Sequence, residues 1–314
     1  LGLKKHNFAI GLWAPYSAIT SYPERVAGQP SPQRYSMLTL NGSALAIPGV
    51  YGSWLPEKNV ALGAGVEMLT GYFQTSVVFS ACVPDRFICA PEQPEFDAAS
   101  QLRVGPIFAP SGVIGAIVQP TEIVKIGASF HLPFWISSPA TVSVRLPAAS
   151  VFDNASQDGD EASVDFQLPY TLRTGIEITP IERLHFELGF GYEGWAMHDE
   201  ITVTPENVAL RDVEAFPAEY RVSELSIQRR FENSWSTRLG AEMGFPVGSY
   251  VIDLRAGVMY EKSAIPPAYL NASTIDLDKT TFSFGGSLHV GKWRFDGVLA
   301  RVVGTPVDVG LDEQ

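Results

Sequence analysis

Two short runs have residue types and spacing that active sites use. Gly189-Phe-Gly191-Tyr-Glu-Gly194 matches the GxGxxG pattern of dinucleotide binding, and His198-Asp199-Glu200 groups three titratable side chains. Dinucleotide binding requires a helix that opens at the glycines and holds the pyrophosphate at its N-terminus, whereas these glycines lie in a predicted strand. No Ser or Cys in a recognisable elbow lies near His198. We therefore predict no enzyme, no catalytic residue and no cofactor.

The two cysteines, Cys82 and Cys89, flank a short segment between a predicted strand and a Pro/Glu-rich loop. This spacing suits a loop-closing disulfide in an oxidising compartment, and two free thiols are the alternative. No second Cys/His pair with the spacing of metal ligands lies near them, so we predict no metal site.

Charges of opposite sign also occur close together on predicted strands, as in Arg238/Glu242, Asp253/Arg255 and Arg294/Asp296. Acid–base catalysis would require carboxylates with pKa values shifted by burial, which a sequence does not reveal. We interpret these pairs as ion pairs in a polar interior.

The composition limits the elements that can position such residues. The 314 residues are 46% hydrophobic and 18% charged, yet no apolar run is long enough for a membrane-spanning helix. The net charge of −12 and the absence of a Lys/Arg cluster argue against a nucleic-acid partner. A membrane protein of this composition would have to cross the bilayer with strands.

The stretch from Leu168 to Trp195 predicts two such strands, joined by a tight turn at Thr179-Pro180. On the second strand, alternate residues form an apolar row (Leu184, Phe186, Leu188, Phe190, Tyr192) and an opposing row of charges and glycines (Arg183, His185, Glu187, Gly189, Gly191, Glu193). The same alternation recurs after Leu62, Trp235, Ile252 and Phe282. A soluble sandwich would seldom repeat glycines opposite its apolar rows, because glycine weakens strands. The pattern predicts an all-β protein, an antiparallel transmembrane β-barrel with lipid outside and a polar lumen inside.

The connections between the predicted strands support a barrel. We place strands near 7–18, 34–55, 59–80, 101–119, 122–146, 161–179, 182–204, 231–245, 248–263, 280–291 and 293–304. Short turns (56–59, 120–121, 180–181, 246–248, 291–292) alternate with long polar loops (19–33, 81–100, 147–160, 205–230, 264–279). Bacterial outer-membrane barrels have short periplasmic turns and long external loops. Strand-end tryptophans (Trp13, Trp54, Trp195, Trp235, Trp293) would then lie at the membrane interfaces, or in the core.

The residues from 168 to 195, LPYTLRTGIEITPIERLHFELGFGYEGW, resemble a hairpin of the FadL/TodX family of outer-membrane transporters for hydrophobic compounds. Phe8 to Glu24 is similar to the family's early strand and loop. Ala256 to Pro267, followed by TTFSFGGSLHV, is similar to a later strand, loop and strand. The resemblance implies a 14-stranded barrel plugged by an N-terminal hatch, of which about eleven strands are present here. We therefore expect residues 1–314 to form a single outer-membrane β-barrel domain that lacks the hatch and the closing C-terminal strands.

The resemblance also implies a function: passive uptake of long-chain fatty acids or other hydrophobic ligands past lipopolysaccharide, by a monomer surrounded by outer-membrane lipid, with a lateral exit into the bilayer. A lipase-type or phospholipase-type barrel enzyme and a non-specific porin or structural barrel remain the alternatives. In the family the exit lies at a kinked early strand, and the matching segment here is Ala14-Pro15-Tyr16, where Pro15 would interrupt the ladder. An ordinary strand end at Trp13 is the alternative.

His131, Phe134 and Trp135 form an aromatic cluster near the long loops. We expect them to line an external apolar groove that captures ligand, and interfacial aromatics are the alternative.

Overall fold

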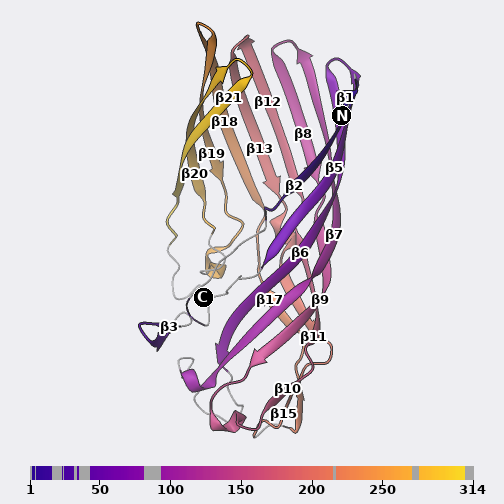
Figure 1. Ribbon diagram of the computed structural model, residues 1–314, viewed down its shortest axis with the longest axis vertical. Helices are drawn as coiled ribbons and strands as arrows, with labels where there is room; N and C mark the ends of the chain where they lie inside the picture. Colours follow the sequence, from indigo (N-terminus) through magenta and orange to yellow (C-terminus); the bar gives the residue numbers. More distant parts are fainter. Residues whose placement is uncertain are drawn as a thin grey trace.

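The computed structural model describes residues 2–3, 5–15, 23, 25–31, 34, 43–80, 93–214, 217–270 and 276–307. It consists of antiparallel strands and four short 3₁₀ helices in these ranges. Within them, none of the helices has the length and apolar character that a membrane span requires. The strands form one large curved sheet, with smaller sheets in the lower part of Figure 1.

Eleven long strands in the described ranges succeed one another across this sheet. They are β2 (His6–Trp13), β5 (Ala44–Glu57), β6 (Val60–Ser80), β7 (Asp97–Thr121), β8 (Val124–His131), β12 (Thr171–Ile181), β13 (Leu184–Glu193), β18 (Ser234–Val247), β19 (Tyr250–Glu261), β20 (Lys279–Val290) and β21 (Trp293–Gly304). The predicted all-β antiparallel architecture is confirmed, and Figure 1 shows the sheet curling into a barrel wall.

The remaining elements are shorter, apart from β9 and β11, and several extend the wall. Those that extend it are β9 (Phe134–Arg145), β11 (Glu161–Leu168), β14 (Glu200–Pro205) and β17 (Leu225–Gln228). The others are β1 (Gly2–Leu3), β3 (Arg25–Val26), β4 (Gln29–Pro30), β10 (Ser156–Asp158), β15 (Ala209–Arg211), β16 (Glu219–Arg221), η1 (Pro94–Phe96), η2 (Ser150–Phe152), η3 (Trp195–Met197) and η4 (Pro267–Tyr269).

Tight turns of two residues join five pairs of long strands. They are Lys58-Asn59, Glu122-Ile123, Glu182-Arg183, Gly248-Ser249 and Gly291-Lys292. The turns lie at one end of the barrel, the top in Figure 1, whereas β10 and β15 lie at the opposite end. The predicted separation of short turns from long loops is therefore confirmed.

The turn at Gly291-Lys292 is as predicted, but the other four were placed too early, because the prediction put the prolines in them. The prolines are the last residue but one of their strands (Pro56, Pro120, Pro180, Pro246), and each turn follows two residues later. The ladder shifts register next to Pro56, Pro120 and Pro180. Since proline has no N–H to donate, it is tolerated at this frayed end of a ladder.

The alternation of side chains is confirmed on the hairpin that predicted it. Phe186, Leu188 and Phe190 are 41–52% exposed on the outer face, and Leu188 is paired with Leu239 of β18, itself 53% exposed. Their neighbours His185 and Glu187 line an interior cavity. An exposed apolar belt of this size is what a lipid-facing surface requires.

Three predicted strands are each divided in two. The strand predicted over 122–146 becomes β8 and β9, interrupted at Leu132-Pro133, and the one over 161–179 becomes β11 and β12, interrupted at Pro169-Tyr170. The strand over 182–204 becomes β13 and β14, with η3 between them. The strand predicted over 7–18 ends at Trp13, and the one over 34–55 is described as a strand from Ala44.

Prolines also invert which residues face inward. In β8 the odd-numbered residues such as Lys125 line the interior, whereas in β9, after Pro133, the even-numbered Phe134 and Ile136 are buried. Pro169 separates β11 from β12 in the same way. Since Phe134 pairs with Leu168 and His131 with Thr171, the two prolines lie opposite each other.

A third inversion, at Gly105-Pro106 within β7, interrupts the wall. β7 pairs with β8 up to Val113–His131 and with β9 from Val104–Ala140 onward, and no ladder pairs join 105–112 to 132–139. A continued register would set the buried Ile107 opposite the outward-facing Ser137. Residues directly opposite in a ladder must share a face, so the ladder cannot run through this stretch.

Beyond these prolines the interior is apolar. The main core cluster consists of Leu45, Ile47, Leu69, Val104, Ile107, Ala109, Phe134, Ile136, Ala140, Ala162, Val164, Leu168 and Val203, which come from β5, β6, β7, β9, β11 and β14. The barrel is thus polar inside near its short turns and apolar inside toward its long loops.

Candidate functional site

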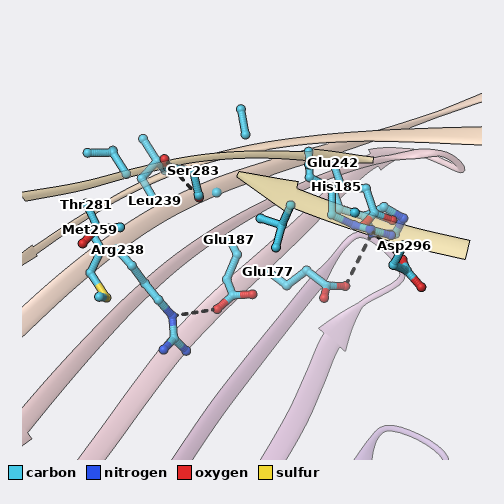
Figure 2. Close-up of a pocket in the computed structure, with 18 of the residues that line it drawn as sticks. Glu177, His185, Glu187, Arg238, Leu239, Glu242, Met259, Thr281, Ser283 and Asp296 are labelled. Carbon is cyan, nitrogen blue, oxygen red and sulfur yellow. Dashed lines mark hydrogen bonds and ion pairs between the residues drawn. The ribbon is translucent and has the colours of Figure 1, made fainter. Parts of the chain in front are cut away.

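Two adjoining cavities occupy the polar part of the interior. The larger measures about 930 Å³ and the smaller about 560 Å³, and Lys125, Glu177, Glu187 and Arg238 line both. In the larger one Arg238 bonds to Glu187 across neighbouring strands, and His185 lies near Glu177 (Figure 2). Glycines such as Gly240 and Gly257 leave room between these side chains.

Arg255 is the centre of the charged network in the larger cavity. Its guanidinium bonds to Glu242, to Asp296 at 3.2 Å and to Ser287 at 2.6 Å, and it lies 3.5 Å from Asp253. The predicted pairs Asp253/Arg255 and Arg294/Asp296 are confirmed.

The predicted pair Arg238/Glu242 is wrong, because each residue has a cross-strand partner instead. Arg238 on β18 faces Glu187 on β13, and Glu242 is directly opposite Arg255 on β19. Directly opposite and diagonal cross-strand side chains are closer than residues four apart along one strand.

A buried carboxylate separates the charged cavities from the apolar core. Glu67 on β6 is 4% exposed, and it accepts hydrogen bonds from the Tyr51 hydroxyl on β5, at 2.7 Å, and from His131 Nε2 on β8. The Tyr51 ring lies over Gly49 and Gly65, where a Cβ would collide with it, and packs against Trp13. These glycines are therefore required by the close approach of the ring.

The predicted ligand-binding residues do not all meet. His131 and Phe134 are in ring contact, with centroids 5.4 Å apart, and Phe134 is fully buried in the apolar core. Trp135 is 57% exposed and faces outward. Trp135 thus belongs to the outer surface and the other two to the interior.

The residues expected at a lateral opening and in a disulfide are only partly described. Ala14 follows the end of β2 and Pro15 lies in a turn, while Tyr16 lies outside the described residues. Cys82 and Cys89 also lie outside them.

The expected interfacial tryptophans divide into two groups. Trp54, Trp235 and Trp293 are exposed near the ends of their strands. Trp13 is also 45% exposed but lies against Tyr51, and Trp195 packs on the apolar core.

The GxGxxG run opens no α-helix in the described structure. Gly189 and Gly191 lie within β13, and Gly194 precedes the three-residue η3 and is packed against the Tyr170 ring. The dinucleotide interpretation therefore fails on the geometry as well.

His198 lies outside the membrane-spanning part of the wall, in a cluster of aromatic rings. It contacts Phe166, Trp195 and Phe231, and its Nδ1–H donates to the Gln167 carbonyl at 2.6 Å. Burial, with the nearby cation Arg229 as a lesser cause, lowers the pKa of His198 despite that hydrogen bond. Burial likewise lowers the pKa of Arg229.

Sequence reasoning missed Glu67 and Arg229. Glu67 had a signal, since it is the one acid in the glycine-rich inward row of β6 (LGAGVEM). Arg229 had none, because the partners of a loop cation depend on tertiary contacts.

The exposed apolar belt, the short turns at one end and the polar lumen together define an outer-membrane β-barrel. The profile of the outer membrane protein transport protein family (OMPP1/FadL/TodX) matches residues 4–306, and this chain belongs to that family. The family comprises outer-membrane transport proteins for hydrophobic compounds, so the localisation in the bacterial outer membrane is confirmed.

Solved structures agree in fold at low sequence identity. A Pseudomonas aeruginosa FadL homologue superposes with a TM-score of 0.74 at 15% identity, over 99% of this chain and 70% of that one. The Ralstonia pickettii toluene transporter TbuX gives 0.61 at 16% identity, over 95% and 73%. The P. putida toluene transporter TodX gives 0.54 at 14%, over 94% and 71%. No curated protein matches significantly.

Proposed function

We propose that this chain mediates passive uptake of hydrophobic small molecules, of which long-chain fatty acids are the first candidates, with a lateral exit through the barrel wall. The observation that carries the proposal is the interruption between β7 and β9. It lies where the interior changes from charged to apolar. For an apolar solute at this level, entering the bilayer is favourable, whereas entering the charged cavities near the short turns is unfavourable.

The position of the interruption suits such an exit. It begins just past Leu132, whose N–H still donates to the Gly112 carbonyl at 2.8 Å. That is about ten residues beyond the turn at Glu122-Ile123, or roughly one tilted crossing, so the interruption lies at the outer edge of the hydrocarbon core. Phe108, Leu132 and Trp135 border it on the outer face and are 45–67% exposed. Ile107 and Phe134 fill it from inside and are at most 1% exposed. In this proposal the described arrangement is closed, and these side chains must move for a solute to pass.

Residues 14–16 remain a second candidate for the exit. Pro15 follows β2, whose last residue Trp13 is opposite Ile47 of the apolar core. Replacing Pro15 with threonine should reduce uptake without changing the amount of folded barrel if the exit lies there. Unchanged uptake in Pro15→Thr leaves the interruption between β7 and β9 as the exit.

The experiment that tests the function is uptake by bacterial cells that lack their own channels for hydrophobic compounds. Expression of the chain should accelerate uptake of a radiolabelled long-chain fatty acid, of toluene, or of both, and should leave uptake of sugars unchanged. Faster entry of sugars would indicate a non-specific porin. Release of fatty acid from phospholipid by the purified protein would indicate an outer-membrane lipase. Either result without uptake of hydrophobic compounds would contradict the proposal.

A further inference from the structure

Arg229 lies where the apolar interior reaches the external side of the barrel. Its loop follows β17, and its backbone N–H donates to the carbonyl of Asp199 at 2.6 Å. Through the His198 cluster it adjoins Phe166 and Trp195, and both of these pack on the apolar core. A cation therefore stands at the rim of a continuous apolar region.

The guanidinium of Arg229 has no counter-ion within the described part of the chain. Its Nε is buried and makes no hydrogen bond, although the residue as a whole is only half-buried.

The acids close to Arg229 in sequence are bonded elsewhere. Asp199 lies 3.9 Å from Arg230, Glu232 lies 3.4 Å from Lys262, and Glu200 accepts from Ser226 and Gln228. None of these carboxylates is paired with Arg229.

The backbone beside Arg229 is strained. Arg230 has φ +52, a left-handed conformation that a residue with a side chain seldom adopts. Both N–H groups of Arg229 and Arg230 converge on the Asp199 carbonyl, which holds this conformation. Strain of this kind persists only where the surroundings enforce it, and it is concentrated at functional sites.

A half-buried cation beside aromatic rings is costly without an anion, and a bound carboxylate would supply one. We propose that Arg229 selects cargo that carries a single carboxylate on an apolar body, over neutral hydrocarbons. The carboxylate pairs with the guanidinium of Arg229, and the apolar body lies along Phe166 and Trp195 toward the core. The inference rests on the proposed function and names the chemistry that decides among its candidate cargoes.

The test is a comparison of two probes that differ only in charge: a fluorescent conjugated long-chain fatty acid and its methyl ester. The full chain purified in detergent should bind the acid about tenfold more tightly than the ester, since one hydrogen-bonded ion pair contributes roughly that factor. In Arg229→Gln this preference should fall to about one, with the affinity for the ester unchanged, by loss of that same interaction. Arg229→Lys should keep part of it.

Arg230→Gln is the matched control, because Arg230 carries the same charge one residue away and already has Asp199 as its partner. It should retain the preference for the acid. Binding of the ester by each variant shows that the apolar site is intact, so a misfolded variant is recognised. The inference is overturned if Arg229→Gln keeps the preference, if it loses acid and ester equally, or if the wild-type chain shows no preference. Failure of the wild-type chain to bind either probe would instead contradict the proposed function.

Discussion

The carboxylate of Glu67 on β6 and the imidazole of His131 on β8 are hydrogen-bonded across the intervening strand β7. The bond lies on the inner face, at the level where the charged cavities end and the apolar core begins. It ties together strands on both sides of the place where β7 leaves β8.

Replacing His131 with alanine should destabilise the barrel by about 1–3 kcal/mol, because Glu67, at 4% exposure, would lose a donor that water cannot fully replace. Unfolding by urea in lipid vesicles, followed by gel mobility, measures the change. Lys125→Met is the control: the Lys125–Glu177 pair is 46% and 34% exposed, so its loss should cost below about 1 kcal/mol. Equal losses of stability in the two variants would show that the Glu67–His131 bond contributes no more than an exposed ion pair.

Phe134 and Trp135 are neighbours with opposite environments, and their alanine variants should differ accordingly. Phe134→Ala removes a fully buried ring and should cost about 3–5 kcal/mol. Trp135→Ala removes a side chain that is 57% exposed on the outer face and should cost much less. A fluorescent fatty-acid binding assay on both variants tests the predicted groove as well. Undiminished binding by both would remove these residues from the ligand site.

Gly71 cannot be replaced, since it has φ +134 and a Cβ there would lie 1.9 Å from the Ala44 carbonyl oxygen. The backbone strain alone should cost Gly71→Ala about 1–3 kcal/mol, and the collision adds to it. Gly63 lies on the same strand, and its Cβ would meet nothing closer than 3.7 Å. The yield of folded barrel should therefore fall in Gly71→Ala and persist in Gly63→Ala. A well-folded Gly71→Ala barrel would show that β5 and β6 can separate here.

Acid should loosen the external part of the barrel through His198. Its pKa in the folded protein lies below the ordinary value of 6.5, so the unfolded chain binds the proton more readily. The stability that neutral His198 contributes is therefore complete above pH 6.5 and is lost as the pH falls below it. Urea midpoints between pH 8 and pH 5 measure the slope, which should be shallower in His198→Gln than in the wild type. An unaltered slope in that variant would assign the pH dependence to other groups, and His6→Gln, at an exposed position, is the control.

Much of the fold follows from residue types and spacing, because a strand that faces lipid on one side must alternate. The rows around Phe186 and Leu188 required no knowledge of their partners. The prolines were harder to interpret. Pro180 looks like a turn residue, yet it is the last residue but one of its strand. Pro133 interrupts a stretch that was expected to be a single strand.

The interior contacts depend on register, which the sequence does not specify. Arg238 and Glu242 are close in sequence, but the pairing of β13 with β18 gives Arg238 a different partner, Glu187. Glu67 and His131 are 64 residues apart, and only the stagger of three strands brings them together.

The three inward–outward inversions at prolines restrict how this wall can change in length. Between a tight turn and the proline at which the inward face inverts, a strand can gain or lose residues only in pairs. Adding one residue would turn every later side chain to the opposite face. A single insertion is harmless only if it moves or removes the inversion itself. Natural or engineered variants of β8, β9, β11 and β12 should therefore differ in length by even steps, and an odd step should appear together with the loss of Pro133 or Pro169 or with a new bulge.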